Sequence, residues 1–179
     1  MNKIKKTMAQ LDRFDVSAYR DVNKIPVFVV LDNVRSAHNV GSVFRSCDAF
    51  RVAKIFLCGI TPVPPNAEIH KTALGATESV QWEYVENTLK VVEQLKNNGV
   101  LVYSIEQAVN SISLNDVKKE EKGCALIFGH EVYGVNQNII DVSDACLEIP
   151  QFGTKHSLNV SVCAGITIHF MANLYGLIL

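Results

Sequence analysis

Short apolar runs recur along the chain and alternate with segments of helical periodicity. Runs of this length suit strands that are buried on both faces of a sheet, and they are too short for helices. We predict strands at residues 27–31, 53–58, 80–85, 100–105, 124–128 and 146–149, and helices at 43–50 and 87–98. Helices between strands imply crossover connections, so the pattern predicts an α/β fold with a mostly parallel sheet and helices on both faces.

The C-terminal segment carries two conflicting patterns. Apolar residues alternate strictly from Leu158 to Phe170, as in a strand. The stretch is much longer than a typical strand of about 5–6 residues, and several intervening positions are apolar as well. We therefore predict a buried helix that begins near Ser157, although it is rich in β-branched residues, because helix propensity is a weak prior.

Length and composition are those of one globular domain. The chain has 179 residues, of which 48% are hydrophobic and 20% charged. This composition excludes a collagen-like or low-complexity chain and gives no support to disorder. Polar residues interrupt the apolar stretch at 158–179, so we do not predict a membrane span. The N-terminus lacks the apolar core of a signal peptide, and we expect a cytoplasmic protein.

The five cysteines are scattered, odd in number and without a Cys-x-x-Cys pair. This usage is typical of neither a disulfide framework nor a zinc site, and we predict that they are small core residues. The five histidines show no metal-binding spacing either, and we assign no metal.

Charge divides the chain into two parts. Residues 1–24 carry a net charge of +3 and residues 25–179 a net charge of −4. We expect a short basic N-terminal segment at 1–24 and a single domain at 25–179. The basic segment could contact phosphate, or it could be a solvated tail. From charge alone we favour the solvated tail.

The first unusual segment, residues 31–45, follows a predicted strand and opens a helix. Ligands of open parallel sheets bind beyond the carboxyl ends of the strands, which places Asn33, Asn39, Gly41 and Arg45 suitably for a site. Asn39 is expected to cap the helix and Gly41 to let a ligand approach the backbone. The alternative, that Asn39 is only a cap and Arg45 a surface residue, stays open here.

Two further segments place polar residues at strand ends. In residues 126–134, Glu131 is bracketed by Gly129 and Gly134. In residues 148–161, a glycine loop leads into Ser157 and Asn159, more polar groups than one helix cap needs. Both segments indicate functional sites rather than plain turns.

The three segments together resemble the SpoU (TrmH-like) family of RNA ribose 2′-O-methyltransferases. Residues 39–45 match Asn-x-Gly-x-x-x-Arg, residues 128–134 match Phe-Gly-x-Glu-x-x-Gly, and residues 149–161 match Ile-Pro-x-x-Gly-x-x-x-Ser-Leu-Asn-Val-Ser. All three occur in order, and the resemblance extends from residue 25 to the C-terminus. It implies an α/β-knot methyltransferase fold of the SPOUT type, a trefoil knot in which the C-terminal segment threads through a loop. Gln151 and Cys163 depart from the residues common in the family, away from the catalytic positions.

The resemblance also implies a cofactor and a set of site residues. The cofactor is S-adenosylmethionine, and its slot is implied to lie among Ile105, Gly129, Ile149 and Leu158. The implied catalytic residues are Arg45, Asn39, Glu131, Ser157 and Asn159. The implied substrate is tRNA or rRNA, and the implied assembly is a homodimer that pairs through the apolar C-terminal stretch 174–179.

Two versions of the chemistry remain open. A ribose hydroxyl is a poor nucleophile until its proton is drawn away, and the family's proposed agent corresponds to Arg45. A guanidinium is effectively never deprotonated in proteins, so Arg45 either grips a neighbouring phosphate and orients the hydroxyl, or acts as a base with help from phosphate. The alternative functions are an inactive RNA-binding protein of the same fold and, less favoured, a nucleotide-binding protein, for which no Gly-x-Gly-x-x-Gly or Walker loop is present.

Overall fold

The computed structural model describes residues 3–7 and 9–178. Strands and helices alternate through most of the chain. The strands are β1 (Ile25–Asp32), β2 (Val52–Cys58), β3 (Trp82–Val85), β4 (Leu101–Ile105), β5 (Ile112–Ser113), β6 (Cys124–Phe128) and β7 (Ala145–Glu148). The helices are α1 (Val16–Asp21), α2 (Ala37–Ala49), α3 (Ala67–Ala73), α4 (Ala76–Ser79), α5 (Thr88–Asn97), α6 (Gln137–Ile140) and α7 (Val160–Leu174), with 3-10 turns at Ala9–Leu11 and Leu114–Asp116.

Within the described residues the strands form one sheet, and every pairing in it is parallel. The strand order is β3-β2-β1-β6-β4-β7-β5. The interior strand β1 places Val29 opposite Ile55 of β2 and Leu126 of β6. All six predicted strands are present, and the parallel arrangement is confirmed. The edge strand β5 was not predicted, because a strand of two residues is too short to show a hydrophobic pattern.

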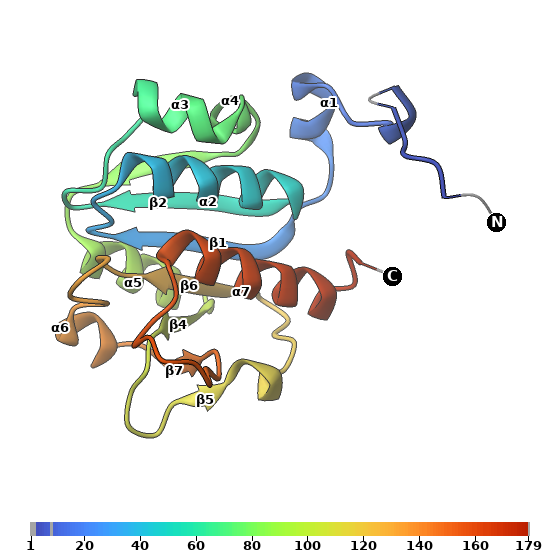
Figure 1. Cartoon of the computed structure of the whole chain (residues 1–179). Helices are drawn as coiled ribbons and strands as arrows, with labels where there is room; N and C mark the ends of the chain where they lie inside the picture. The colour runs from blue at the N-terminus through green and yellow to red at the C-terminus, as the bar shows by residue number, and fades with distance from the viewer. Residues whose placement is uncertain (1–2, 8, 179) are drawn as a thin grey trace.

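Helices cover both faces of the sheet, as the sequence predicts (Figure 1). On one face α2 and α7 lie side by side, and on the other face lie α5 and α6. Side chains of β1 alternate between the two cores: Val29 and Leu31 pack in the core with α2 and α7, and Val30 packs in the core with α5. Two apolar cores therefore hold the sheet rigid between its helix layers.

The C-terminal segment is a helix, and the strand-like alternation in its sequence is misleading. α7 begins at Val160 after its cap Asn159, close to the predicted start near Ser157. Its fully buried side chains, including Ala164, Ile168 and Met171, follow helical spacing. No helix of the described residues is long and apolar enough to cross a membrane.

The helices near the site differ from the predicted ones: one begins earlier, and two were not predicted. α2 begins at Ala37 rather than residue 43, because Ser36 caps it and its first turn is polar. α3 and α4 were not predicted. They are short, and a loop with three prolines at 61–66 precedes them.

The N-terminal segment docks only in part. Asp15 caps α1, and Tyr19 of α1 is buried and donates a hydrogen bond from its hydroxyl to the backbone carbonyl of Asp48 at 2.8 Å. Residues 3–7 are exposed, and the chain extends away from the body (Figure 1). The sequence also suggests a short helix over residues 8–14; there the described residues form the 3-10 turn Ala9–Leu11, and Met8 lies outside them.

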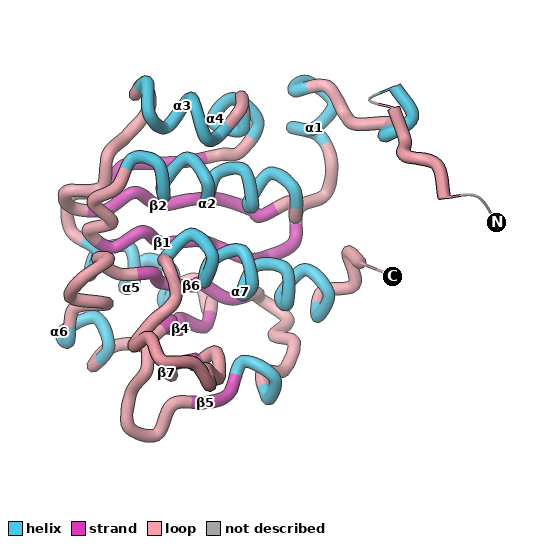
Figure 2. The backbone as a smooth tube through the Cα atoms, in the orientation of Figure 1, coloured by secondary structure: helices cyan, strands magenta, loops and turns pink. Residues whose placement is uncertain are grey.

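The C-terminal chain crosses back over the sheet. β7 lies beyond β4 in the sheet, whereas α7 returns to pack beside α2 near the middle strand (Figure 2). Such a return is what a threaded C-terminus requires. The knot itself stays a prediction from the resemblance.

Candidate active site

The carboxyl ends of the parallel strands open on a cavity of about 910 Å³. Its walls are the loops that follow β4, β6 and β7, together with the start of α7. The four residues assigned to a cofactor slot, Ile105, Gly129, Ile149 and Leu158, all line it. The fold thus brings residues from the ends of three strands, β4, β6 and β7, to one place, as expected at this edge of a parallel sheet.

Glu131 joins the loop after β6 to the start of α2. Its carboxylate accepts hydrogen bonds from the backbone N–H of Arg35 at 3.0 Å and of Ser36 at 2.9 Å. It also accepts one from the side-chain amide Nδ2 of Asn39 at 3.0 Å. These donors lie at the N-terminus of a helix, where the helix dipole favours a negative charge.

The surroundings of Glu131 hold it in the charged form. Burial alone raises the pKa of this carboxyl, but the hydrogen bonds from Arg35, Ser36 and Asn39 outweigh burial and lower the pKa below its ordinary value. At neutral pH Glu131 is therefore a carboxylate and only accepts hydrogen bonds.

Asn159 extends the network to α7. Its Oδ1 caps α7 by accepting from the backbone N–H of Ser161 and Val162, and its Nδ2 donates to Oδ1 of Asn39 at 3.2 Å. Three of the five predicted catalytic residues, Glu131, Asn39 and Asn159, thus form one hydrogen-bonded chain that joins all three motif segments.

Two expectations for the first motif are wrong. The cap of α2 is Ser36, and Asn39 uses its side chain to bridge Glu131 and Asn159. Gly41 does not face a ligand: a Cβ there would overlap Oγ1 of Thr72 and the carbonyl oxygen of Ile69 in α3. Gly41 is needed because α2 and α3 pack closely at this point.

The glycines around Glu131 shape its loop. A Cβ on Gly129 would overlap the backbone of Gly134 and Val135, and Gly134 has a φ of +68°. His130 and Gly134 exchange backbone hydrogen bonds across the loop at 3.0 and 2.8 Å. The two glycines therefore allow a tight loop that holds Glu131 toward α2.

Arg45 and Ser157 stand apart from this network. Arg45 lies on the exposed face of α2, six residues and about 9 Å along the helix from Asn39. It does not line the cavity, and within the described residues no hydrogen bond or ion pair involves its side chain. Ser157 is exposed at the cavity mouth.

Asn33 has a structural role rather than a place in the site. It has a φ of +57°, donates to the buried carboxylate of Asp32 at 2.9 Å and accepts from the backbone N–H of Ile60 at 3.2 Å. Asp32 in turn accepts a hydrogen bond from Thr88 at 2.6 Å. These contacts fix the loops after β1 and β2.

Sequence reasoning missed two polar residues of the cavity wall. The carboxylate of Glu106 accepts from the backbone N–H of Gln107 at 2.9 Å and of Val135 at 3.1 Å. Gln107 donates from its side chain to the carbonyl of His156 at 2.7 Å, which ties the loop before α7 to the loop after β4. The available signal was their place directly after a predicted strand.

The cysteines are free, as predicted. Cys47, Cys58 and Cys124 are buried, and burial raises the pKa of Cys58 and of Cys124 to about 12. Cys163 lines the cavity, and burial raises its pKa to about 11. In the part of the chain that the structure describes, no three His, Cys, Asp or Glu side chains are grouped to hold a metal ion.

Known proteins resemble this chain over most of its length. The model of the SpoU rRNA methylase family matches residues 26–169. The 23S rRNA (guanosine-2′-O-)-methyltransferase RlmB of Vibrio parahaemolyticus is 31% identical over 164 residues, which cover 91% of this chain and 65% of that protein. The tRNA (guanosine(18)-2′-O)-methyltransferase of Aquifex aeolicus is 30% identical over 144 residues, which cover 80% of this chain and 67% of that protein.

Solved structures agree with the sequence relatives. The AdoMet-bound rRNA methyltransferase from Sinorhizobium meliloti superposes with a TM-score of 0.79 at 26% identity, over 87% of this chain and 59% of that one. This chain spans about two thirds, or less, of the length of these three proteins.

Proposed function

The chain belongs to the SpoU rRNA methylase family, and from this premise we propose that it transfers a methyl group from S-adenosylmethionine to a ribose 2′-hydroxyl of tRNA or rRNA. The observation that carries the proposal is the chain of hydrogen bonds from Glu131 through Asn39 to Asn159. It joins the three motif segments at the mouth of one large cavity. Relatives named for action on 23S rRNA and on tRNA support RNA as the substrate class without choosing between the two.

The cavity fits the cofactor chemically. Ile105, Ile149 and Leu158 supply apolar surface for a flat adenine, and Gly129 lines the same wall. The carboxylates of Glu106 and Glu131 also line it, and they suit a ligand with positive sulfonium and ammonium groups. When bound, the cofactor supplies an electrophilic methyl group.

The residues of this chain act on the hydroxyl and its surroundings. Arg45 grips an RNA phosphate through its planar guanidinium and so orients the neighbouring ribose. Asn39, Glu131 and Asn159 position the helix ends that flank the reacting ribose, with Ser157 at the mouth of the cavity. Rate then comes mainly from alignment of the hydroxyl oxygen with the methyl group, and the hydroxyl proton passes to water at the cavity mouth as the new O–C bond forms.

Arg45 lies away from the cavity of its own protomer, and we propose that a second copy of the chain completes the site. Val162 and Ile166 of α7 are 50% and 41% exposed, an apolar strip on the helix that packs beside α2. Pairing of two copies across this strip would bury it and bring Arg45 of one protomer toward the cavity of the other.

The expectation of a dimer now rests on α7 rather than on the apolar C-terminal stretch 174–179. The C-terminal residues Leu174, Tyr175, Leu177 and Ile178 are partly buried against the protomer's own core, and Leu179 lies outside the described residues. The exposed apolar side chains that support pairing are Val162 and Ile166 of α7 itself. Sedimentation should find a dimer at micromolar concentration, and Ile166→Lys should yield a monomer that still binds cofactor.

Complementation tests the shared site. Arg45→Ala removes the phosphate clamp, and Leu158→Arg fills the cavity. Each variant alone should be inactive, whereas mixed dimers should regain activity, because one of their two sites combines an intact Arg45 with an intact cavity. If the mixture stays inactive while mixed dimers form, each protomer uses its own Arg45.

Methyl transfer itself is tested with tritium-labelled cofactor and bulk RNA. The wild-type protein should label RNA, whereas Arg45→Ala should lose several orders of magnitude of activity with near-normal cofactor affinity by calorimetry. Cofactor binding without transfer to any RNA would favour an inactive RNA-binding protein of the same fold. If Arg45→Lys keeps most activity, a point charge suffices and bidentate geometry is not needed.

A further inference from the structure

The loop that carries Glu131 also presents an aromatic ring to solvent. Tyr133 is 83% exposed, whereas Phe44, Phe56 and Phe128 are buried in the cores. Within the described residues the Tyr133 hydroxyl has no hydrogen-bond partner. No hydrogen bond of this side chain therefore fixes the position of the ring. The ring therefore contributes little to the stability of the protomer.

One neighbour supports the ring from behind. The imidazole of His130 lies against Tyr133 with ring centroids 4.8 Å apart and an interplanar angle of 34°. Nδ1 of His130 accepts a hydrogen bond from the backbone N–H of Val132 at 3.0 Å, which fixes the orientation of the imidazole. The backbone bonds between His130 and Gly134 fix the loop beneath both rings. The pair is a preorganised aromatic surface, and little conformational freedom remains to be lost when something stacks on it.

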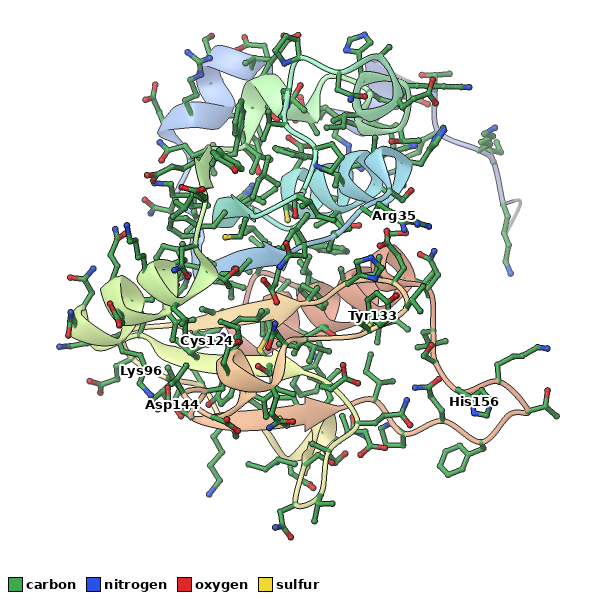
Figure 3. The ribbon with its side chains drawn as sticks, turned by 90° about the vertical axis from the view of Figure 1, so that its left-hand side faces the viewer. Arg35, Lys96, Cys124, Tyr133, Asp144 and His156 are labelled. Atoms are coloured by element: carbon green, nitrogen blue, oxygen red, sulfur yellow. The ribbon has the colours of Figure 1, made fainter. Side chains whose placement is uncertain are left out.

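The position of this pair is as informative as its geometry. Both residues line the cavity assigned to the cofactor, and Glu131 lies between them in sequence. Arg35, whose backbone N–H bonds to Glu131, is exposed on the same edge of the molecule as Tyr133 (Figure 3). A cation and an exposed aromatic ring beside one cavity are the combination with which proteins bind unpaired nucleotides.

We propose that Tyr133, supported by His130, is a stacking surface for an unpaired base of the substrate RNA within one nucleotide of the reacting ribose. This inference rests on the proposed function and adds the position that recognises the base. A base that leaves the helical stack as its ribose enters the cavity mouth loses its stacking partners, and the exposed face of Tyr133 replaces them. Arg35 is placed to meet an adjacent phosphate.

Three variants of the full-length protein separate stacking from other roles. Tyr133→Ala removes the ring, Tyr133→Phe keeps the ring without its hydroxyl, and Val132→Ala alters a neighbour that is also exposed but not aromatic. The assay uses tritium-labelled cofactor and total RNA from cells that lack the gene. Tyr133→Ala should weaken RNA affinity, measured as KM for RNA, about 5- to 100-fold, whereas Tyr133→Phe and Val132→Ala should stay within about twofold of wild type. Cofactor affinity by calorimetry should be unchanged in all three.

Ultraviolet crosslinking gives a readout that does not depend on turnover. Irradiation of the wild-type protein with the same RNA should attach a nucleotide to residue 133, located by mass spectrometry of the peptides. Crosslinks confined to other segments, or an unchanged KM in Tyr133→Ala, would overturn the proposal. Weaker cofactor binding by Tyr133→Ala would also overturn it, because the ring would then stack on the cofactor. A wild-type protein that methylates no RNA would contradict the proposed function instead, and the crosslink would still decide whether Tyr133 meets a base.

Discussion

The carboxylate of Glu131 shows how one residue can connect distant parts of the chain. Its three donors come from residues 35–39, about ninety positions away in sequence. The sequence pattern identifies Glu131 as functional because it lies between two glycines after a buried strand. It cannot show that the partners are backbone N–H groups of a helix start, because nothing in the local pattern reports which loop lies opposite.

The ionisation of Glu131 gives the first prediction. Its pKa in the folded protein is lowered, so its stabilising contribution is complete above the unfolded value of about 4.3 and is lost as the pH falls through the lower folded value. Nuclear magnetic resonance of the side-chain carboxyl carbon should give a midpoint below about 4.3. The Glu131→Gln variant should lose part of the acid dependence of its unfolding free energy. A midpoint near neutrality would show that the hydrogen bonds do not outweigh burial.

Helix α2 shows where sequence reasoning about an element fails. The motif places Gly41 beside Asn39, and a glycine in a motif suggests close approach of a ligand. The true neighbour is α3, an element that was not predicted, so the packing role of Gly41 could not be recognised from the sequence. The strands were easier to predict, because each is buried on both faces and its apolar run is complete in itself.

Substitution of Gly41 measures this helix contact. Gly41→Ala should destabilise the fold by about 1–3 kcal/mol, since the added methyl group meets a backbone carbonyl that cannot easily move. Denaturant unfolding should show a lower midpoint with an unchanged slope. Cofactor affinity of the folded fraction should be unchanged. A stable variant with weaker cofactor binding would show instead that Gly41 contributes to the ligand site.

Asn159 at the start of α7 separates capping from the bridge to Asn39. Asn159→Ala should lose about 1 kcal/mol of stability, because α7 loses its cap. Asn159→Ser should keep most of that stability, since serine also caps helices, yet it cannot reach Asn39. We therefore expect both variants to lose methyl-transfer activity while only Asn159→Ala loses stability. Full activity in Asn159→Ser would show that the bridge has no role in the reaction.

At the scale of the whole molecule, the parallel sheet with helices on both faces was predictable from the alternation of strands and helices. The return of α7 to the middle of the sheet was not, because periodicity carries no information on threading. Periodicity does not show the location of Arg45 outside the cavity either; only the family resemblance suggests that Arg45 lies away from the cofactor slot.

The basic N-terminal segment bears on how the whole molecule binds RNA, outside the cavity. Lys3, Lys5 and Lys6 are exposed on a segment that extends from the body. Deletion of residues 1–7 should weaken RNA binding modestly and flatten its dependence on salt, by up to about two to three units of logarithmic slope if all three contact phosphate. Turnover at saturating RNA should be unchanged. Equal affinities and parallel slopes at three salt concentrations would identify the segment as a solvated tail.

The central claim is transfer of a methyl group to a ribose hydroxyl, and nucleoside analysis tests it most directly. Total RNA from cells that lack the gene is incubated with S-adenosylmethionine and either the wild-type protein or Arg45→Ala, then digested to nucleosides and measured by mass spectrometry. The wild-type protein should produce a 2′-O-methylated nucleoside that is absent after incubation with Arg45→Ala. A methyl group found only on a base, or no new methylated nucleoside with the wild-type protein, would contradict the account.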